Sequence, residues 1–266
     1  MTKCHLDLTW LRFRSFTIQP MQRRPTHELL DDDSGTPKEV ADSLLDLRWF
    51  NRWFGGIATT RALIQTVADR TGRSEFSLLE VAAGDGSLVN TVRAELQSSG
   101  IRLNLTLLDR AASHLPAFRN HNGHSAAGVG NAGLDQDSRS AVVADALSLP
   151  FPDSTFDLIS CSLFVHHLPP EQAVLFAKQA LRVCSVAVLI HDLVRSPLHL
   201  AFAYAGTPLY RSRITRNDAP ASVRQAYTIE EMKQFFRATG AGGVESRMHY
   251  FYRMGVIAWK GSDPQV

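Results

Sequence analysis

Two glycines stand two residues apart directly after an apolar run, in the segment LLEVAAGDGSLV that covers residues 78–89. Gly84 and Gly86 carry no side chain, so the backbone can adopt left-handed conformations there and a ligand can approach it closely. In a parallel sheet, a glycine-rich turn between the first strand and the first helix lies at the carboxyl end of a strand, where ligands bind. The segment predicts a ligand site, with a tight turn that holds no ligand as the alternative.

The spacing of these glycines narrows the kind of ligand. A dinucleotide site of the Gly-x-Gly-x-x-Gly type would place glycine at positions 82, 84 and 87, but the chain has Ala82, Gly84 and Ser87 there. A phosphate-binding P-loop would need a Gly-Lys-Ser/Thr sequence, which does not follow. The turn therefore fits a ligand that needs close backbone approach but no phosphate cradle.

Other polar residues follow further apolar runs. Asp109 ends the run LTLLD and can accept hydrogen bonds from ribose hydroxyls, although capping of the helix expected from residue 111 is an alternative. His166 and His167 follow a fourth run, and His191 lies within a fifth. Histidine has a pKa suited to proton transfer near neutral pH. The alternatives are a structural hydrogen bond for His167 and a core position for His191.

These residues need a framework of alternating strands and helices. The pattern predicts strands at 77–82, 103–108, 142–143, 156–163 and 186–193, helices at 87–96, 111–118 and 171–183 between them, and two helices before them at about 38–54 and 58–70. Thr228 and Glu231 form a capping-box pattern that begins a last helix at 228–239. Two extended runs, 244–250 and 252–259, then predict a hairpin at the sheet edge.

The expected fold class is α/β: a doubly wound, mostly parallel seven-stranded sheet of Rossmann-like type, with an antiparallel C-terminal hairpin and N-terminal helices. The expected divisions are a disordered arm at 1–27, a helical cap at 28–72 and the main domain at 73–266 with a lid at 196–227. Residues 121–135 predict a surface loop whose histidines are solvated, and no metal site is expected.

Composition sets further limits on function. The 266 residues carry a formal net charge of +2, which is too small to indicate a nucleic-acid surface. No apolar run is long enough to span a membrane. Three cysteines without metal-ligand spacing are typical of reduced thiols, so we expect a cytoplasmic protein.

Taken together, the motifs resemble those of class I S-adenosylmethionine-dependent methyltransferases, small-molecule (ubiquinone/menaquinone-biosynthesis-like) branch. The resemblance covers residues 76–195, including LPFPDSTFDLISCSLFVHHL at 149–168. It implies S-adenosyl-L-methionine as cofactor. The implied cofactor-binding residues are Glu80, Ala82, Gly84, Gly86, Asp109, Asp145 and Ala146. Ala82 departs from the family glycine, and its methyl group fits if the residue keeps ordinary strand dihedrals.

The resemblance also implies methyl transfer to a small-molecule acceptor, an aromatic, phenolic, quinone-like or polyketide-derived hydroxyl or carbon. His166 and His167 are the candidate catalytic residues. Arg216 and Arg224 are candidates for binding an anionic acceptor, with internal salt bridges to Asp192 or Asp218 as the alternative. The apolar lid at 198–210 would roof a hydrophobic pocket. Alternatives for the whole chain are an NAD(P)-dependent oxidoreductase and a non-catalytic S-adenosylmethionine-binding domain.

Overall fold

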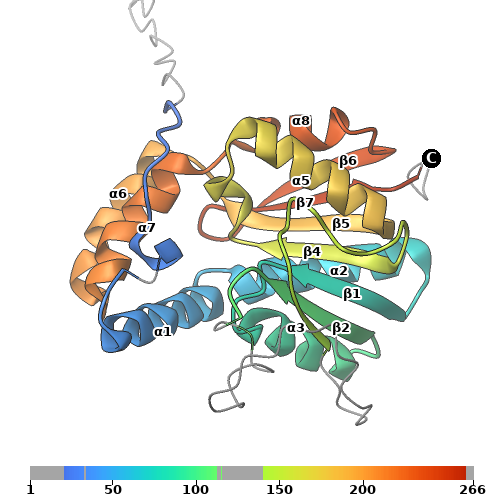
Figure 1. Ribbon diagram of the computed structural model, residues 1–266, viewed down its shortest axis with the longest axis horizontal. Coiled ribbons are helices and arrows are strands. Elements are labelled where there is room, and N and C mark those ends of the chain that lie inside the picture. The colour runs from blue at the N-terminus through green and yellow to red at the C-terminus, as the bar shows by residue number, and fades with distance from the viewer. Residues whose placement is uncertain (1–20, 33, 113–114, 116–139, 262–266) are drawn as a thin grey trace, which may run out of the picture.

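The computed structural model describes residues 21–32, 34–112, 115 and 140–261. A single seven-stranded sheet with helices on both faces forms the centre of the molecule (Figure 1). Its strands run in the order β3-β2-β1-β4-β5-β7-β6. The order reverses direction at β1, so the carboxyl ends of β1 and β4 flank the switch point at which doubly wound sheets bind ligands.

The strands confirm the predicted alternation. Five pair in parallel, and the last two form the antiparallel hairpin that extends the sheet from β5. The predicted hairpin is therefore confirmed, with its second strand inserted next to β5. The bounds are β1 Glu75–Val81, β2 Arg102–Asp109, β3 Ser140–Val143, β4 Phe156–Ser162, β5 Cys184–Leu193, β6 Gly243–His249 and β7 Arg253–Trp259.

The helices begin and end close to the expected positions. The capping boxes of α1 (Thr36 with Glu39) and α8 (Thr228 with Glu231) are both formed. The bounds are α1 Pro37–Trp53, α2 Gly56–Thr71, α3 Ser87–Ser98, α5 Pro170–Val183, α6 Pro197–Ala205, α7 Arg213–Gln225 and α8 Ile229–Arg237, with short 3-10 helices η1 Leu29–Asp32, η2 Val165–His167 and η3 Thr207–Leu209. The expected loop at 121–135 and most of the expected helix at 111–118 lie outside the described residues.

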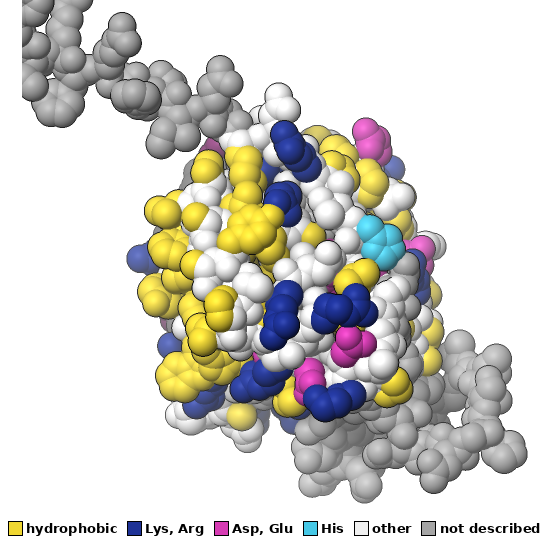
Figure 2. Space-filling model, turned by 90° about the vertical axis from the view of Figure 1, so that its left-hand side faces the viewer, with side chains coloured by type: hydrophobic (Ala, Val, Ile, Leu, Met, Phe, Trp, Pro, Cys, Tyr) yellow, Lys and Arg dark blue, Asp and Glu magenta, His cyan; other side chains and the backbone are white. Residues whose placement is uncertain are grey.

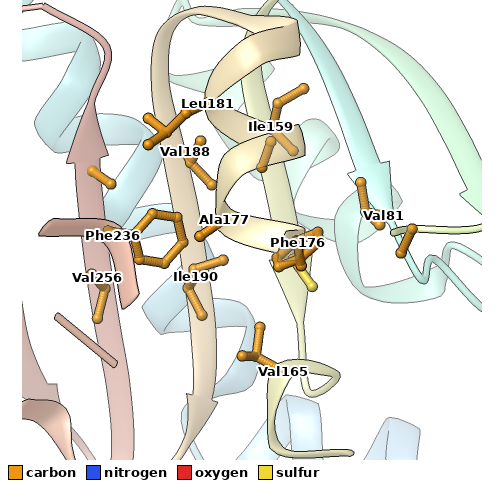
Figure 3. Close-up of a cluster of buried hydrophobic side chains, with 14 of the residues drawn as sticks. Val81, Ile159, Val165, Phe176, Ala177, Leu181, Val188, Ile190, Phe236 and Val256 are labelled. Carbon is orange, nitrogen blue, oxygen red and sulfur yellow. The ribbon is translucent and has the colours of Figure 1, made fainter. Parts of the chain in front are cut away.

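Each face of the sheet buries its own apolar core, because successive strand residues point to opposite sides. On one face, α5 and α8 contribute Phe176, Ala177 and Phe236, which pack on Val188 and Ile190 of β5 (Figure 3). On the other face, α2 and α3 pack on the remaining strand residues, so α2 is part of the sheet sandwich. Both cores leave the carboxyl ends of the parallel strands open for a site.

Helices α1, α6 and α7 form a second layer of structure beside that edge, which we call the cap (Figure 1). The buried carboxylate of Asp46 in α1 fastens it to the start of α7, since it accepts hydrogen bonds from the Arg211 and Ser212 amides at 2.9 and 3.3 Å. Figure 2 views the side of the molecule on which this cap lies, where hydrophobic side chains gather on the left and Lys and Arg lie mainly nearer the centre. The expected division into a helical segment at 28–72 and a main domain at 73–266 with a lid at 196–227 stays a prediction.

The N-terminal part of the described chain corrects one expectation. Residues 21–27 do not belong to a disordered arm, because Arg23 donates to the main-chain oxygens of Gln225, His166 and Leu168 at 2.7, 2.9 and 3.0 Å. Its guanidinium also lies 4.3 Å from the ring centroid of Tyr227. These long-range contacts hold the segment against α7 and η2.

No helix in the described ranges is long and apolar enough to cross a membrane.

Candidate active site

The glycine turn after β1 has the backbone conformation that its sequence predicts. Gly84 and Gly86 have φ values of +55° and +67°, in the left-handed region. A Cβ on Gly86 would lie 2.7 Å from Leu107 Cδ1, so packing also excludes a larger residue there. A Cβ on Gly84 would meet no atom within 4 Å, so the space over that residue is open. The turn thus combines close packing below with free space above.

Ala82 differs from the expectation. Its φ is +54°, so the condition stated for its methyl group, ordinary strand dihedrals, is not met. The chain reverses directly after β1, and the left-handed conformation of Ala82 starts that reversal. For an L-residue with a Cβ this conformation costs roughly 1–2 kcal/mol, which explains why a glycine would be favoured at this position.

Asp109 connects the glycine turn to the next strands. Its Oδ2 accepts a hydrogen bond from the Gly84 amide at 2.8 Å, and its Oδ1 accepts one from the Ala111 amide at 2.9 Å. The capping contact weighed for Asp109 is thus present, and its role in ligand binding stays a prediction. The Asp109 main-chain oxygen accepts from the Ala144 amide at 3.1 Å, which places Asp145 and Ala146 next in line.

Asp145 and Ala146 lie at the carboxyl end of β3. Asp145 is exposed and its Oδ1 accepts a hydrogen bond from the Leu147 amide at 2.9 Å, while Ala146 is buried. The structure thus brings together the ends of β1, β2 and β3 as a continuous ledge. This arrangement is the one in which a nucleoside can lie across a sheet edge.

Glu80 lies beneath this ledge and is almost fully buried. Burial raises its carboxyl pKa to about 7, against a smaller lowering by the Ser160 and Ser162 hydroxyls. Its Oε2 makes no hydrogen bond within the described structure. A buried carboxyl with an unused acceptor is suited to a cationic or hydrogen-bond-donating ligand group nearby.

A cavity of about 540 Å³ runs from the glycine turn to the cap. Residues 82–85 form one part of its wall, and α1, α6 and α7 supply much of the rest. The wall on the side of the cap is aromatic, as expected for an apolar roof: its rings belong to Trp49, Phe50, Phe54, Phe202, Tyr210 and Phe251. The volume is in the range of small-molecule sites.

Arg253 is a cavity residue that the sequence did not single out. Its side chain is 5% exposed and lines the cavity, and its Nε donates to the Phe54 main-chain oxygen at 3.2 Å. Burial lowers its pKa to about 10, so the guanidinium stays charged at neutral pH. Its Nη1 has no hydrogen-bond partner in the described structure. It lies at the start of β7, and no local sequence pattern indicates that this end of the hairpin reaches the site.

The two candidate catalytic histidines both line the cavity. His166 is buried, and its Nδ1 lies 2.6 Å from Asp192 Oδ1. Burial alone would lower the pKa of His166, but the Asp192 and Glu28 carboxylates raise it to about 10. His167 is less buried, and its Nδ1 lies 3.1 Å from Asp31 Oδ2. The two carboxylates therefore favour the protonated imidazolium form of His166, which is not a base.

His191 is a core residue, the alternative that its apolar strand suggested. Burial, with the Arg253 charge as a further cause, lowers its pKa to about 3, so it is neutral. Its Nδ1 lies 3.4 Å from Thr60 Oγ1, inside the sheet sandwich.

Arg216 and Arg224 are not among the residues that line the cavity. Arg216 donates to the Tyr210 main-chain oxygen at 3.2 Å, and Arg224 contacts the hydroxyl of Tyr204. Neither forms the expected alternative pair with Asp192 or Asp218. Asp218 instead accepts from the Leu29 and Leu30 amides at 2.8 and 3.0 Å.

Comparisons with known proteins agree with this geometry. The family model described as methyltransferase domain matches residues 79–188, which contain the glycine turn and β2 to β4. A search of curated protein sequences gave no significant match.

Solved methyltransferase structures share the fold at low sequence identity. The plantazolicin methyltransferase BpumL in complex with SAH is 10% identical with a TM-score of 0.62, over 88% of this chain and 94% of that one. A SAM-dependent methyltransferase from Aquifex aeolicus is 14% identical with a TM-score of 0.52, over 83% and 97%. The methyltransferase SibL in its apo form is 19% identical with a TM-score of 0.57, over 89% of this chain and 63% of that one.

A sheet of this order and a glycine turn after β1 are typical of class I methyltransferases, whose cofactor is S-adenosylmethionine. The family match places a methyltransferase domain at residues 79–188, so this part of the chain is an S-adenosylmethionine-dependent methyltransferase domain. The residues present fit the cofactor, since the space above Gly84 is open and the Asp109 carboxylate lies directly beside it.

Proposed function

We propose that the protein transfers a methyl group to a small aromatic acceptor that carries an ionisable hydroxyl, a phenolic, quinol or polyketide-derived compound. The observation that carries the proposal is the cavity itself, which joins the glycine turn to an aromatic wall in one continuous space of about 540 Å³. Neighbouring solved methyltransferases act on other acceptors, as the name plantazolicin methyltransferase indicates, so the likeness alone does not choose the acceptor.

In this proposal the sheet edge holds the cofactor. The Asp109 carboxylate binds the ribose hydroxyls, Asp145 and Ala146 contact the adenine, and the turn from Ala82 to Gly86 lies against the methionine part, above Glu80. S-adenosylmethionine, when bound, supplies a methyl group already activated for transfer. The protein then mainly aligns the acceptor, and such positioning can lower a barrier by roughly 7–11 kcal/mol.

Arg253 supports the choice of an acidic acceptor. A buried guanidinium with an unpaired N–H in an aromatic cavity stabilises an anionic oxygen, because guanidinium donors match oxyanions well. Holding the acceptor as an anion also removes the need for a base, which His166 cannot provide while it keeps its proton. The part of His167 in the reaction stays a prediction, as does the cytoplasmic location.

The first test is the thermal unfolding midpoint with S-adenosylhomocysteine, with NAD and with neither. At about 100 times Kd, S-adenosylhomocysteine should add about 2.7 kcal/mol of stability, whereas NAD should add none. Asp109→Asn keeps the volume but removes the charge, and each lost hydrogen bond to a charged group costs about 1.5–3 kcal/mol, so affinity should fall at least tenfold.

Asp153→Ala is a matched control, since Asp153 is exposed and its partner is Arg182. It should leave binding unchanged. A midpoint that rises with NAD alone would favour an oxidoreductase. Cofactor binding without methyl transfer to any of a panel of phenols and quinols would favour a non-catalytic binding domain.

A further inference from the structure

One part of the cavity wall is polar and contains possible metal ligands. Glu28, His166 and His167 each bring one ligand atom to within 4.8 Å of the other two. Glu28 and His166 are only 6% and 2% exposed, and all three residues line the cavity. Glu28 lies in the segment before η1, and the two histidines lie in η2. These segments are far apart in the chain and meet here because Arg23 donates to the His166 main-chain oxygen.

A carboxylate holds each imidazole from behind. His166 Nδ1 lies 2.6 Å from Asp192 Oδ1, and His167 Nδ1 lies 3.1 Å from Asp31 Oδ2. A carboxylate at Nδ1 accepts a hydrogen bond from Nδ1–H, which fixes the ring and leaves the Nε2 lone pair for a metal ion. Both neighbouring histidines therefore have Nδ1 held by a carboxylate and Nε2 available as a ligand atom.

The spacing around His166 Nε2 also suits an ion. This atom lies 3.7 Å from Glu28 Oε1, which is too long for a hydrogen bond. Two ligand atoms at about 2.1 Å from a tetrahedral ion would be about 3.4 Å apart, a few tenths of an ångström less. Glu28 Oε1 is also held by Ser222 Oγ at 2.6 Å and Gln225 Nε2 at 2.5 Å, so the carboxylate is fixed in place.

The negative charges around the cluster favour binding of a cation. The carboxylates of Glu28, Asp31 and Asp192 surround the two imidazoles, with oxygen-to-nitrogen distances of 3.7, 3.1 and 2.6 Å. Arg23 directs its donors at main-chain oxygens. A divalent ion bound by Glu28, His166 and His167 would place positive charge among these carboxylates.

We propose that Glu28, His166 and His167 bind one divalent transition-metal ion in the cavity wall, with Asp192 and Asp31 orienting the two histidines. Two histidines and one carboxylate with a remaining position open are the ligands of catalytic zinc sites. The same ligand types also suit other divalent ions such as Fe²⁺. The open position would face the cavity and take a water molecule or an anionic oxygen. The inference goes beyond the proposed methyl transfer and does not depend on it.

The test uses the untagged full chain, freed of metal with a chelator. Zn²⁺ is titrated by calorimetry in two buffers of different ionisation enthalpy, and Co²⁺ by its visible absorption. We expect one equivalent of either ion to bind, with release of about one proton or more for Zn²⁺, because the ligands must be deprotonated. The thermal midpoint should rise with Zn²⁺ in proportion to the saturation of this site.

Variants locate the site. His167→Gln and Glu28→Gln should each weaken Zn²⁺ binding more than tenfold, and Asp31→Asn should weaken it about tenfold, as is usual for a residue that orients a ligand. The matched control replaces both His121 and His124 with asparagine and should bind Zn²⁺ like the parent. S-adenosylhomocysteine binding by His167→Gln shows that this variant is folded.

Two results would overturn the proposal. One is the absence of both a binding heat and a cobalt spectrum in the parent chain, which would leave the cluster as an ion network that holds a proton on His166. The other is unchanged Zn²⁺ affinity in His167→Gln. Either result leaves the cofactor-binding test unaffected, so failure of the metal site and failure of the proposed function are distinguishable.

Discussion

At the scale of single residues, burial decides which charges can do chemistry. Arg253 stays protonated although burial lowers its pKa to about 10. Glu80 is also buried, and burial raises its carboxyl pKa to about 7. Each has a polar atom without a hydrogen-bond partner in the described structure. Such atoms cost stability unless a ligand satisfies them, so both residues give separable predictions for binding and for stability.

Arg253→Met keeps the shape of the side chain but removes its charge. We expect kcat/KM for an acidic phenol to fall about 10–100-fold, since a hydrogen bond to a charged group contributes about 1.5–3 kcal/mol. Stability should be unchanged or higher, because the variant no longer buries a charge with an unpaired donor. Steady-state kinetics and urea unfolding measure the two effects. Equal kcat/KM values for parent and variant would remove Arg253 from acceptor binding.

Glu80 makes stability depend on pH. Its pKa is about 7 in the folded protein, raised by burial from 4.5, so the folded state binds the proton more tightly than the unfolded state. Its stabilising contribution is complete below pH 4.5 and is lost as the pH rises through 7. At about 1.4 kcal/mol per pKa unit, the loss amounts to about 3 kcal/mol.

Comparison with Glu80→Gln isolates this contribution, because other titrating groups cancel. The difference in free energy of unfolding between parent and variant should change by about 3 kcal/mol from pH 4.5 to about 8, to the disadvantage of the parent. Chemical denaturation at a series of pH values provides the measurement. A difference that stays constant over this range would contradict the prediction.

At the scale of elements, a buried carboxylate joins α1 of the cap to the start of α7. Asp46 of α1 is 1% exposed and accepts from Arg211 Nη1 at 3.0 Å in addition to two main-chain amides. α1 also reaches the glycine turn, because Arg48 pairs with Asp85. Helix α1 therefore contacts both the segment before α7 and the glycine turn.

Asp46→Ala should lower the free energy of unfolding by about 3 kcal/mol, because it leaves buried amide donors unsatisfied at about 1–3 kcal/mol each. Asp42→Ala on the same helix is the matched control. In the described structure Asp42 pairs with the exposed Lys38, and a surface ion pair of this kind contributes little to stability. Equal losses in the two variants, measured by urea unfolding, would show that the Asp46 contacts do not hold α1 to α7.

At the scale of the whole molecule, the cavity lies between two differently built parts. The sheet has an apolar core on each face, whereas the cap meets it around a hollow of about 540 Å³. Parts with fewer buried apolar contacts open at lower free energy. The cap should therefore be the less protected part until a ligand fills the space.

Hydrogen exchange measures this directly. Amides of α6 and α7 should exchange faster than those of β4 and β5 in the free protein. Their exchange should slow when S-adenosylhomocysteine and a phenol are added together, because the ligands fill the space beneath the cap. The amides of β4 serve as the internal reference and should not change. Equal protection of cap and sheet in the free protein would contradict the prediction.

The sequence alone determined the framework and the first part of the site. Strand and helix periods, Gly84, Gly86 and Asp109 are local signals, because a glycine turn after a strand and an acid at a strand end have their meaning within one βα unit. Local signals did not give the conformation of Ala82 or the contacts of residues 21–27, because these depend on a tight chain reversal and on long-range contacts.

Only the tertiary structure decided what surrounds that framework. Arg253 reaches the cavity because the hairpin pairs antiparallel with β5, so that the start of β7 lies at the carboxyl end of the parallel strands. Glu28 meets His166 and His167 because the N-terminal segment packs along α7 and η2. Such contacts depend on side chains distant in the chain filling a shared space, and no periodicity within either segment encodes them.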